Sequence, residues 1–293
     1  LEHARIMRPG YAIEYDCLDP LQLAPTLAVK GVTGLYSAGQ SNGTSGYEEA
    51  AAQGLIAGIN AARAIAGEEP LILRRSDGYI GVLIDDLVTK GTDEPYRMMT
   101  SRAEYRLILR QDNADLRLTP MGRAAHLVTD ERWTRFIAKR DAIEAALALL
   151  KERRLSPSAE TEARLAEAGI PPLRVPMTLF ALLSREGDYR RLAALFDLPT
   201  LADDVREEVE ITARYDGYIR KQEEQIARME RLEARRIPAD TDYAAIGSLR
   251  LEAAEKLAAV RPRSIGQASR ISGVSPADIS VLLVWLEKER RIS

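Results

Sequence analysis

The sequence of 293 residues has very few side chains of the kinds that build disulfide frameworks and zinc sites. It contains one cysteine, Cys17, and two histidines. A disulfide needs a pair of cysteines and a structural zinc site needs four ligands, so we expect no disulfide framework and no metal. Cys17 lies between Asp16 and Leu18. With no neighbouring base or cation to activate the thiol, we predict that Cys17 is inert.

Long apolar runs and an excess of one charge are also missing. The uncharged stretch at residues 50–62 is too short and too rich in Gln and Asn to cross a bilayer. No signal peptide or lipidation motif is visible, so we expect a cytoplasmic protein with no membrane attachment. The 41 Lys and Arg residues nearly balance the 44 Asp and Glu residues, for a net charge of −3. Any contact with nucleic acid therefore requires a local basic patch.

A complete nucleotide-binding sheet is not encoded in these residues. No G-x-G-x-x-G motif occurs, no βαβ unit precedes residue 34, and the chain begins with Leu1 rather than Met. Residues 11–15 alternate like a strand, but two strands and one helix do not make a nucleotide-binding sheet. We therefore expect this chain to be the C-terminal part of a longer protein. No catalytic constellation is visible in it.

Residues 34–62 contain the most specific pattern of the sequence. They predict a short buried strand at 35–38, a glycine-rich turn, and a long helix of small residues from about Gly46. A strand that turns through glycines into a helix N-terminus presents backbone N–H groups to phosphate or another electron-rich ligand edge. The alternative is an ordinary tight connection between a strand and a helix.

The rest of the chain is predominantly helical in pattern. We predict a mainly α fold, in which a small α/β part is followed by a multi-helix C-terminal domain. Gly67 and Pro70 end the first unit, and the expected divisions are residues 1–68, 69–238 and 239–293. The longest helix is expected at 205–236, with an apolar stripe at three- and four-residue steps. Other helices are expected at 79–87, 120–127, 129–154, 177–183, 249–260, 264–272 and 275–290.

An arginine-rich segment, residues 95–123, follows this first unit. Six arginines face three acids there, and Tyr96 and Tyr105 lie among them. Guanidinium groups suit bidentate phosphate contacts and stacking on bases, so the segment is typical of RNA or cofactor-phosphate binding. If 101–110 is helical, three of the arginines share one face. The alternative is a loop held together by ion pairs. The six arginines are Arg97, Arg102, Arg106, Arg110, Arg117 and Arg123.

A second basic cluster lies near the C-terminus, at Arg261, Arg263 and Arg270. It surrounds a short turn-and-helix pattern that starts at Ser264. RNA, a partner protein and no partner at all are equally compatible with this cluster from the residues alone.

Four motifs together resemble the glucose-inhibited division protein A family, the bacterial tRNA uridine 5-carboxymethylaminomethyl modification enzymes. The motifs occur in the same order as in the family, and the resemblance is weaker at about 150–200. The motifs are RPGYAIEYD at 8–16, GLYSAGQSNGTSGYEEAAAQG at 34–54, EPYRMMTSRAEYRL at 94–107 and SIGQASRISGV at 264–274.

The resemblance implies an FAD protein that modifies C5 of the wobble uridine of certain tRNAs. It also implies NADH and methylene-tetrahydrofolate as co-substrates, a GTPase partner, and a homodimer of the full-length protein. Gln40 would be the FAD-binding side chain, and the helical C-terminal region would bind tRNA and the partner. The implied FAD-contact residues are Gly39, Gln40, Asn42, Gly43, Thr44 and Gly46, and the implied tRNA-binding residues are Arg97, Arg102, Arg106, Arg110, Arg263 and Arg270.

The sequence departs from the family pattern by what it does not contain. The family's G-x-G-x-x-G, nicotinamide region and reactive cysteines would all lie before Leu1, so we expect the chain alone to be inactive. Two other functions stay open. One is a non-catalytic RNA or protein interaction module, and the other is a different FAD oxidoreductase, such as a folate-dependent tRNA methyltransferase.

Overall fold

The computed structural model describes the backbone of residues 3–5, 7, 8, 10 and 14–292, and side chains as far as residue 288. Within this range the chain is mainly helical, which confirms the predicted fold class. The α-helices are α1 (Tyr47–Ala66), α2 (Tyr79–Lys90), α3 (Ala114–Ala124), α4 (Asp130–Glu152), α5 (Ala159–Glu167), α6 (Leu179–Glu186), α7 (Tyr189–Phe196), α8 (Asp203–Glu233), α9 (Leu251–Val260), α10 (Ile265–Ala268) and α11 (Pro276–Ile292). The 3-10 turns are η1 (Pro20–Gln22), η2 (Gln40–Asn42), η3 (Thr100–Arg102) and η4 (Tyr243–Ala245), and the strands are β1 (Arg154–Leu155) and β2 (Met177–Thr178).

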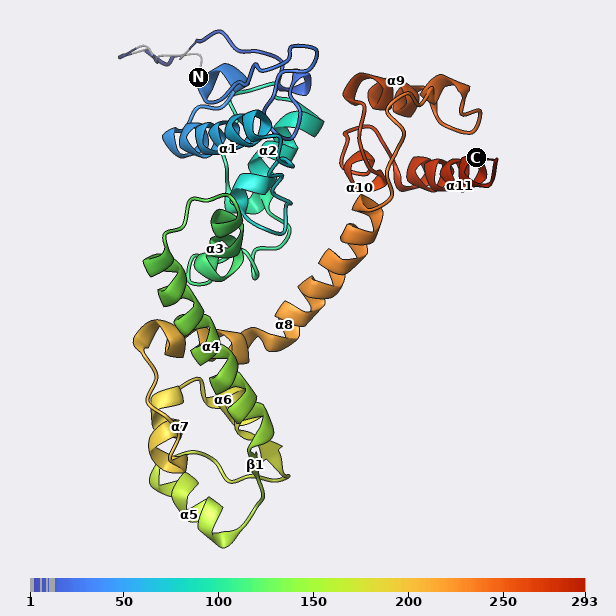
Figure 1. Cartoon of the computed structure of the whole chain (residues 1–293). Coiled ribbons are helices and arrows are strands. Elements are labelled where there is room, and N and C mark those ends of the chain that lie inside the picture. Colours follow the sequence, from blue (N-terminus) through green and yellow to red (C-terminus); the bar gives the residue numbers. More distant parts are fainter. Residues whose placement is uncertain (1–2, 6, 9, 11–13, 293) are drawn as a thin grey trace.

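The helices form three groups that follow one another along the chain (Figure 1). Helices α1, α2 and α3 lie near the N-terminus, α4–α7 form the second group, and α9–α11 form the third. Helix α8 runs from the second group to the third. In the described part of the chain, no helix is both long enough and apolar enough to serve as a transmembrane span.

The first group is built on α1 and α2. Helix α1 begins after the extended Gly46 and ends at Gly67, whose left-handed backbone (φ 70°) closes the last turn. Leu23, Leu27 and Ile56 are almost completely buried, and Leu71, Leu73 and Ile80 pack against the same cluster. The segment after residue 68 thus shares a hydrophobic cluster with the segment before it.

The predicted strand at 35–38 is wrong. Only Tyr36 forms a bridge, to Ala28, and the side chain of Leu35 is half exposed. A strand needs a neighbour that continues the ladder, and the described residues supply only this single bridge. The strand predicted at 11–15 lies mostly outside the described residues, and Glu14 and Tyr15 have no regular structure.

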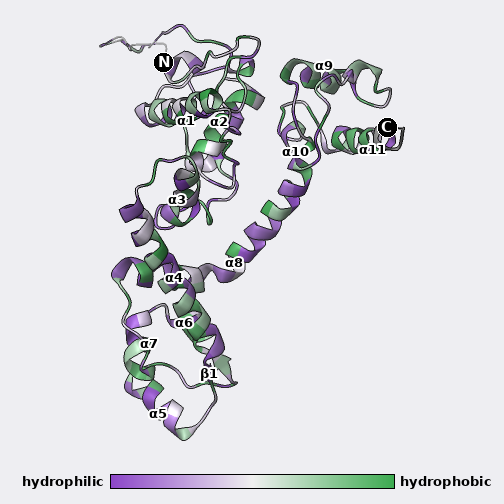
Figure 2. Cartoon of the chain, in the orientation of Figure 1, coloured by the Kyte–Doolittle hydropathy of each residue, from purple (hydrophilic) through white to green (hydrophobic). Residues whose placement is uncertain are grey.

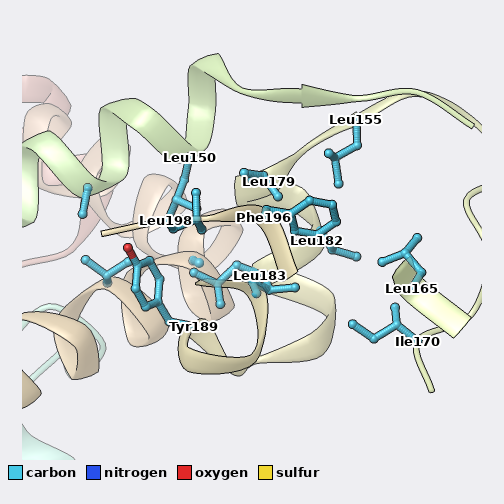
Figure 3. Packing of buried hydrophobic residues seen from close by; sticks show 14 of the residues in the cluster. Leu150, Leu155, Leu165, Ile170, Leu179, Leu182, Leu183, Tyr189, Phe196 and Leu198 are labelled. Atoms are coloured by element: carbon cyan, nitrogen blue, oxygen red, sulfur yellow. The ribbon is translucent and has the colours of Figure 1, made fainter. Parts of the chain in front are cut away.

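The second group contains the largest hydrophobic cluster, shown in Figure 3. Leu150, Leu165, Leu179, Leu182 and Leu192 have no exposed surface, and each such leucine contributes about 1.5–3 kcal/mol. The short antiparallel pair β1–β2 closes this group, joining Arg154–Leu155 to Met177–Thr178. Neither this pair nor α7 was predicted, because two-residue strands have no alternation to detect and α7 has only eight residues.

Two helices of the third group begin with side-chain caps. Ser264 caps α10 by accepting the backbone N–H of Gln267 (3.0 Å). At the start of α11, Ser275 and Asp278 cap each other's backbone N–H groups, and Pro276 occupies the first helical position. Arg250 then holds Asp278 with paired hydrogen bonds.

Helix α8 connects these groups through its predicted apolar stripe. Val209 is buried in the cluster of the second group, Ile226 packs against a cluster of Val82 and Tyr105, and Leu232 packs into the third group. The apolar stripe of α8 therefore contributes to three separate hydrophobic clusters. Figure 2 shows hydrophilic residues along much of this helix, in keeping with the exposure of its other faces.

Two local predictions between α2 and α4 are wrong. Residues 101–110 form the short turn η3 and further turns instead of a helix, so Arg102, Arg106 and Arg110 do not share a helical face. Pro120 does not open a helix but lies inside α3, which begins six residues earlier. The proline removes a single helical hydrogen bond, and α3 ends only four residues later, at Ala124.

Candidate functional site

The glycine-rich turn before α1 is tightly defined by two residues with positive φ. Gly39 has φ 89° and Gly43 has φ 81°, a region that favours glycine, and the two flank η2. A Cβ on Gly43 would lie 2.5 Å from the Thr92 hydroxyl oxygen. The turn therefore packs closely against the loop that follows α2, and Gly43 is required on both grounds.

Gln53, on α1, organises this turn from within. Its side chain is completely buried, accepts hydrogen bonds from the Gly39 N–H (3.2 Å) and Asn42 Nδ2 (2.8 Å), and donates to Thr44 Oγ1 (3.0 Å). It also donates to the Glu49 carbonyl (3.1 Å). Asn42 and Thr44 thus bond inside the turn. Gln53 was not among the residues predicted from the sequence, although a Gln between three alanines and a glycine is a detectable signal.

The outer side of the turn is open. Gln40 is exposed, and no side chain of the described residues caps the first turn of α1 after Gly46. Uncapped N–H groups at a helix start favour an electron-rich ligand edge, and the exposed amide of Gln40 can both donate and accept. The residues of this turn therefore fit the edge of a flavin.

The arginine-rich segment is bonded directly to the turn. The Tyr96 N–H donates to the Gly43 carbonyl (2.8 Å), and the Ser45 N–H donates to the Tyr96 carbonyl (3.1 Å). The buried Glu49 accepts from the Met98 N–H (2.7 Å) and lies 3.4 Å from Arg97 Nε. Residues 43–49 and 96–98 are consequently one structural unit.

The six predicted RNA-binding arginines have two different environments. Arg97, Arg102, Arg106 and Arg263 are exposed, and Arg102 lies over the Tyr96 ring, 4.3 Å from its centroid. Arg110 and Arg270 are instead largely buried in ion pairs. Arg110 pairs with Asp112 and Glu208, and Arg270 pairs with Asp85 and Glu233. For Arg110, these pairs favour the ion-pair alternative, and Arg270 likewise has its partners within the chain.

Behind the turn lies a buried polar network centred on Arg75, which the sequence analysis missed. Its guanidinium contacts Asp86 (2.7 Å) and Glu104 (2.8 Å), and the Tyr96 hydroxyl donates to Asp86 (2.9 Å). Burial alone would lower the pKa of Arg75, but the hydrogen bonds to Glu104 and the charge of Asp86 raise it above its ordinary value. Arg75 therefore stays charged and fixes the segment that carries Tyr96.

Asp112 and Glu208 form a pair of carboxyl groups that share Arg110. Burial, and next the hydrogen bond with Asp112, raise the pKa of Glu208 to about 7. Burial would also raise the pKa of Asp112, but hydrogen bonds from Glu208 and Arg110 lower it below its ordinary value. A proton on Glu208 thus supports the charged form of Asp112.

Comparison with known proteins places this chain. A family model described as glucose inhibited division protein A matches residues 1–69, and two models of the tRNA modifying enzyme MnmG/GidA match the C-terminal helical domain at 130–223 and the C-terminal helical bundle at 225–293. The chain belongs to the MnmG/GidA family. This confirms the family indicated by the four sequence motifs.

Curated relatives in this family are named tRNA uridine 5-carboxymethylaminomethyl modification enzyme MnmG. The protein of Clostridium kluyveri is 58% identical over 293 residues, and that of Caldicellulosiruptor saccharolyticus is 57% identical. In both cases the match covers 99% of this chain and 47% of the relative. The chain thus spans about half the length of the curated relatives that it matches.

Solved structures in the family have the same fold. Aquifex aeolicus GidA in its form II crystal superimposes with a TM-score of 0.82 at 43% identity, covering 97% of this chain and 45% of that one. The form I crystal gives a TM-score of 0.78 at 41% identity, with 92% and 42% covered. The mainly helical architecture is therefore that of known GidA proteins.

Proposed function

We propose that this chain is part of an FAD-dependent enzyme that adds a carboxymethylaminomethyl group at C5 of the wobble uridine of tRNA. The names of its MnmG relatives support this activity. The observation that carries it here is the pairing of Tyr96 with Gly43 and Ser45. This pairing joins a turn suited to a cofactor edge to a segment with exposed arginines. We place the activity in the cytoplasm because the proposed substrate is tRNA.

In this proposal the open side of the glycine turn holds the flavin, which when bound would supply the redox chemistry of the reaction. Gln40 and the N–H groups that follow Gly46 would contact it. Gly39 and Gly43 allow the backbone to come close, and Asn42 and Thr44 hold the turn through Gln53 instead of reaching outward. Of the six predicted FAD-contact residues, some would thus contact the flavin and the others would support the shape of the turn.

The exposed arginines would contact tRNA phosphates. One short segment carries Arg97, Arg102 and Arg106, whereas Arg263 lies on the third group of helices. Arg110 and Arg270 would act indirectly, by holding the segments that carry the exposed ones.

The remaining parts of the proposal concern the whole enzyme. We propose NADH and methylene-tetrahydrofolate as co-substrates, a GTPase as partner, and a homodimer as the full-length assembly. The division into residues 1–68, 69–238 and 239–293 is likewise a proposal. The family resemblance supports these statements, and the C-terminal helices are the proposed docking region for the GTPase.

Titration of tRNA into the chain at several salt concentrations tests the RNA contact. We expect Arg102→Gln and Arg106→Gln each to weaken binding about three- to tenfold and to reduce the salt dependence by about one phosphate contact. Arg135→Gln, an exposed arginine on α4, is the matched control and should leave binding unchanged. An affinity for tRNA that does not depend on salt concentration would refute the proposed contact. An equal loss of affinity in all three variants would refute it as well.

Flavin content tests the cofactor side independently. In the longer protein that contains this chain, Gln40→Ala should release FAD more readily during gel filtration than the wild type does. Tyr47→Ala, an exposed neighbour in the first turn of α1, controls for general disturbance of the helix start. Flavin retention that is the same in all three proteins would show that Gln40 is not a flavin ligand.

A further inference from the structure

A cleft of about 290 Å³ lies where three segments meet, apart from the glycine turn. One wall comes from residues 72–76 and 84–85 with 104–105, the second from α8, and the third from residues 263–270. Ligand pockets begin at about 300 Å³, so this cleft has room for one small ligand of mononucleotide size and not for a dinucleotide such as FAD.

The charged side chains around the cleft differ in whether they already have an ion-pair partner. Its four acids, Asp85, Glu104, Glu230 and Glu233, are each paired with an arginine. Arg236 and Arg263 also line the cleft, both are exposed, and neither makes an ion pair with any residue that the structure describes. Two guanidinium groups are therefore available to an anion, and guanidinium binds phosphate with good geometry.

Apolar side chains line one part of the cleft, beside its charged and polar groups. Ile72, Ile84 and Ile226 contribute to it, and Tyr105 is 5% exposed. None of the hydrogen bonds within the described residues uses the Tyr105 hydroxyl, although this side chain lines the cleft. Burial raises the pKa of Tyr105, so the hydroxyl is protonated and can donate to a ligand.

The walls of the cleft are held in place before any ligand arrives. Arg270 joins the third wall to the first through Asp85 (2.6 Å), and Arg236 forms a β-bridge with Ser264. The bridge sets the backbones that carry Arg236 and Arg263 side by side, since the Ile237 N–H donates to the Arg263 carbonyl (3.0 Å). A ligand therefore meets walls that are already connected.

We propose that this cleft binds a nucleoside monophosphate unit, with the base on the apolar surface and the phosphate on Arg236 and Arg263. The apolar part of the lining, with the Tyr105 hydroxyl beside it, suits a planar base, and two arginines without ion-pair partners in the described part of the chain suit one phosphate. A free nucleotide and a single nucleotide of an RNA chain present the same two groups. The assignment of the cleft therefore does not rest on the proposed tRNA modification.

The test is a calorimetric titration of the chain with uridine and adenosine 5′-monophosphates, and with uridine and inorganic phosphate as partial ligands. The monophosphates should bind at least about tenfold more tightly than either partial ligand. Arg236→Gln and Tyr105→Phe should each weaken that binding about three- to tenfold. Arg228→Gln, an exposed α8 arginine outside the cleft, should bind like wild type, and melting temperatures check folding.

A short single-stranded oligoribonucleotide separates the two sources. If it binds with the same dependence on Arg236 and Tyr105 and uridine 5′-monophosphate competes, the ligand is a nucleotide of RNA. If only the monophosphates bind in this way, the ligand is a free nucleotide. Absence of binding by all of these probes, or binding that Arg236→Gln and Tyr105→Phe leave unchanged, overturns the proposal. Neither variant alters Gln40 or Arg102, so failure here is distinct from failure of the proposed function.

Discussion

Gln53 shows how a single amide can determine the shape of a ligand-facing turn. All of its hydrogen-bonding capacity is used inside the protein, by Gly39, Asn42, Thr44 and the carbonyl of Glu49. A side chain of this kind cannot be replaced by an apolar one of similar size without leaving buried partners unsatisfied. Gln53 therefore determines the shape of the turn without being one of the residues proposed to contact a ligand.

Replacing Gln53 by Leu should lower the free energy of unfolding by about 2–4 kcal/mol, because the Gly39 N–H and Thr44 lose buried partners. Urea denaturation measures the effect. Gln40→Leu changes an exposed glutamine in the same turn and should stay within about 0.5 kcal/mol of wild type. Equal effects of the two substitutions would show that the turn does not depend on Gln53.

Glu208 gives a prediction about pH. Its pKa is raised to about 7, so between its ordinary value of 4.5 and pH 7 the folded state holds a proton that the unfolded state has released. The free energy of unfolding contributed by this group should therefore fall as pH rises through that range, by about 1–3 kcal/mol. Asp112, with a lowered pKa, titrates below this range.

The measurement is urea denaturation at pH values from 4.5 to 8. Glu208→Gln should flatten the decline, whereas Glu207→Gln, which alters the exposed neighbour, should keep it. A decline that persists unchanged in Glu208→Gln would assign it to other groups.

At the scale of elements, α2 is positioned by close backbone contact at Gly81. A Cβ added there would overlap the carbonyl oxygen of Arg74, which is backbone and cannot swing aside. The segment before α2 can therefore cross the helix at this point only because residue 81 has no side chain. This crossing places Arg75 beside Asp86.

Gly81→Ala should consequently destabilise the protein by about 2 kcal/mol or more, despite the better helix propensity of alanine. Gly217→Ala in α8, where a Cβ would meet nothing within 4 Å, should instead stabilise it by about 0.5–1 kcal/mol. Thermal unfolding of the two variants should thus shift in opposite directions. A stabilising Gly81→Ala would mean that the crossing relaxes freely.

Elements with strong local signals could be predicted from the sequence. Helix α1 between Gly46 and Gly67, α4 after Thr129, and α8 with its apolar stripe lie close to their predicted bounds, because caps and periodicity are local. The predictions of a strand at 35–38 and a helix at 101–110 are wrong because whether such segments form depends on contacts with residues distant in sequence. The helix start predicted at Pro120 is wrong because a proline inside a helix removes only one backbone hydrogen bond, and α3 tolerates this loss.

The candidate site was predicted only in part for the same reason. Glycines at 39 and 43 indicate a turn by their residue type, since positive φ is a local requirement. Among the partners of Arg110 and Arg270 are Glu208 and Asp85, which lie 98 and 185 residues away. No spacing rule connects such residues, so the two arginines could not be separated from their exposed neighbours before the structure was known.

At the scale of the whole molecule, Arg270 joins the third group of helices to the first. Its guanidinium pairs with Asp85 on α2 and with Glu233 at the end of α8, and it is largely buried. Breaking a buried ion pair from one side leaves charges without partners, which costs more than the pair itself contributes.

Arg270→Gln should therefore lower the free energy of unfolding by about 3 kcal/mol and speed amide hydrogen exchange in both α2 and α10. The exchange pattern, followed by mass spectrometry, distinguishes a joint between groups from local support of α10 alone. Arg231→Gln, which changes an exposed arginine on α8, should leave both helices protected. Faster exchange confined to α10 would contradict the role of Arg270 as a joint.

The unbroken course of α8 also restricts changes in the length of the chain. A helix turns by about 100° and rises by about 1.5 Å for each residue, so one inserted residue would rotate everything beyond it by that angle. Val209 would stay in the second group while Arg270 moved away from Asp85. Insertions and deletions during evolution should therefore collect in loops such as residues 168–176, and the number of residues between Val209 and Glu233 should be held constant.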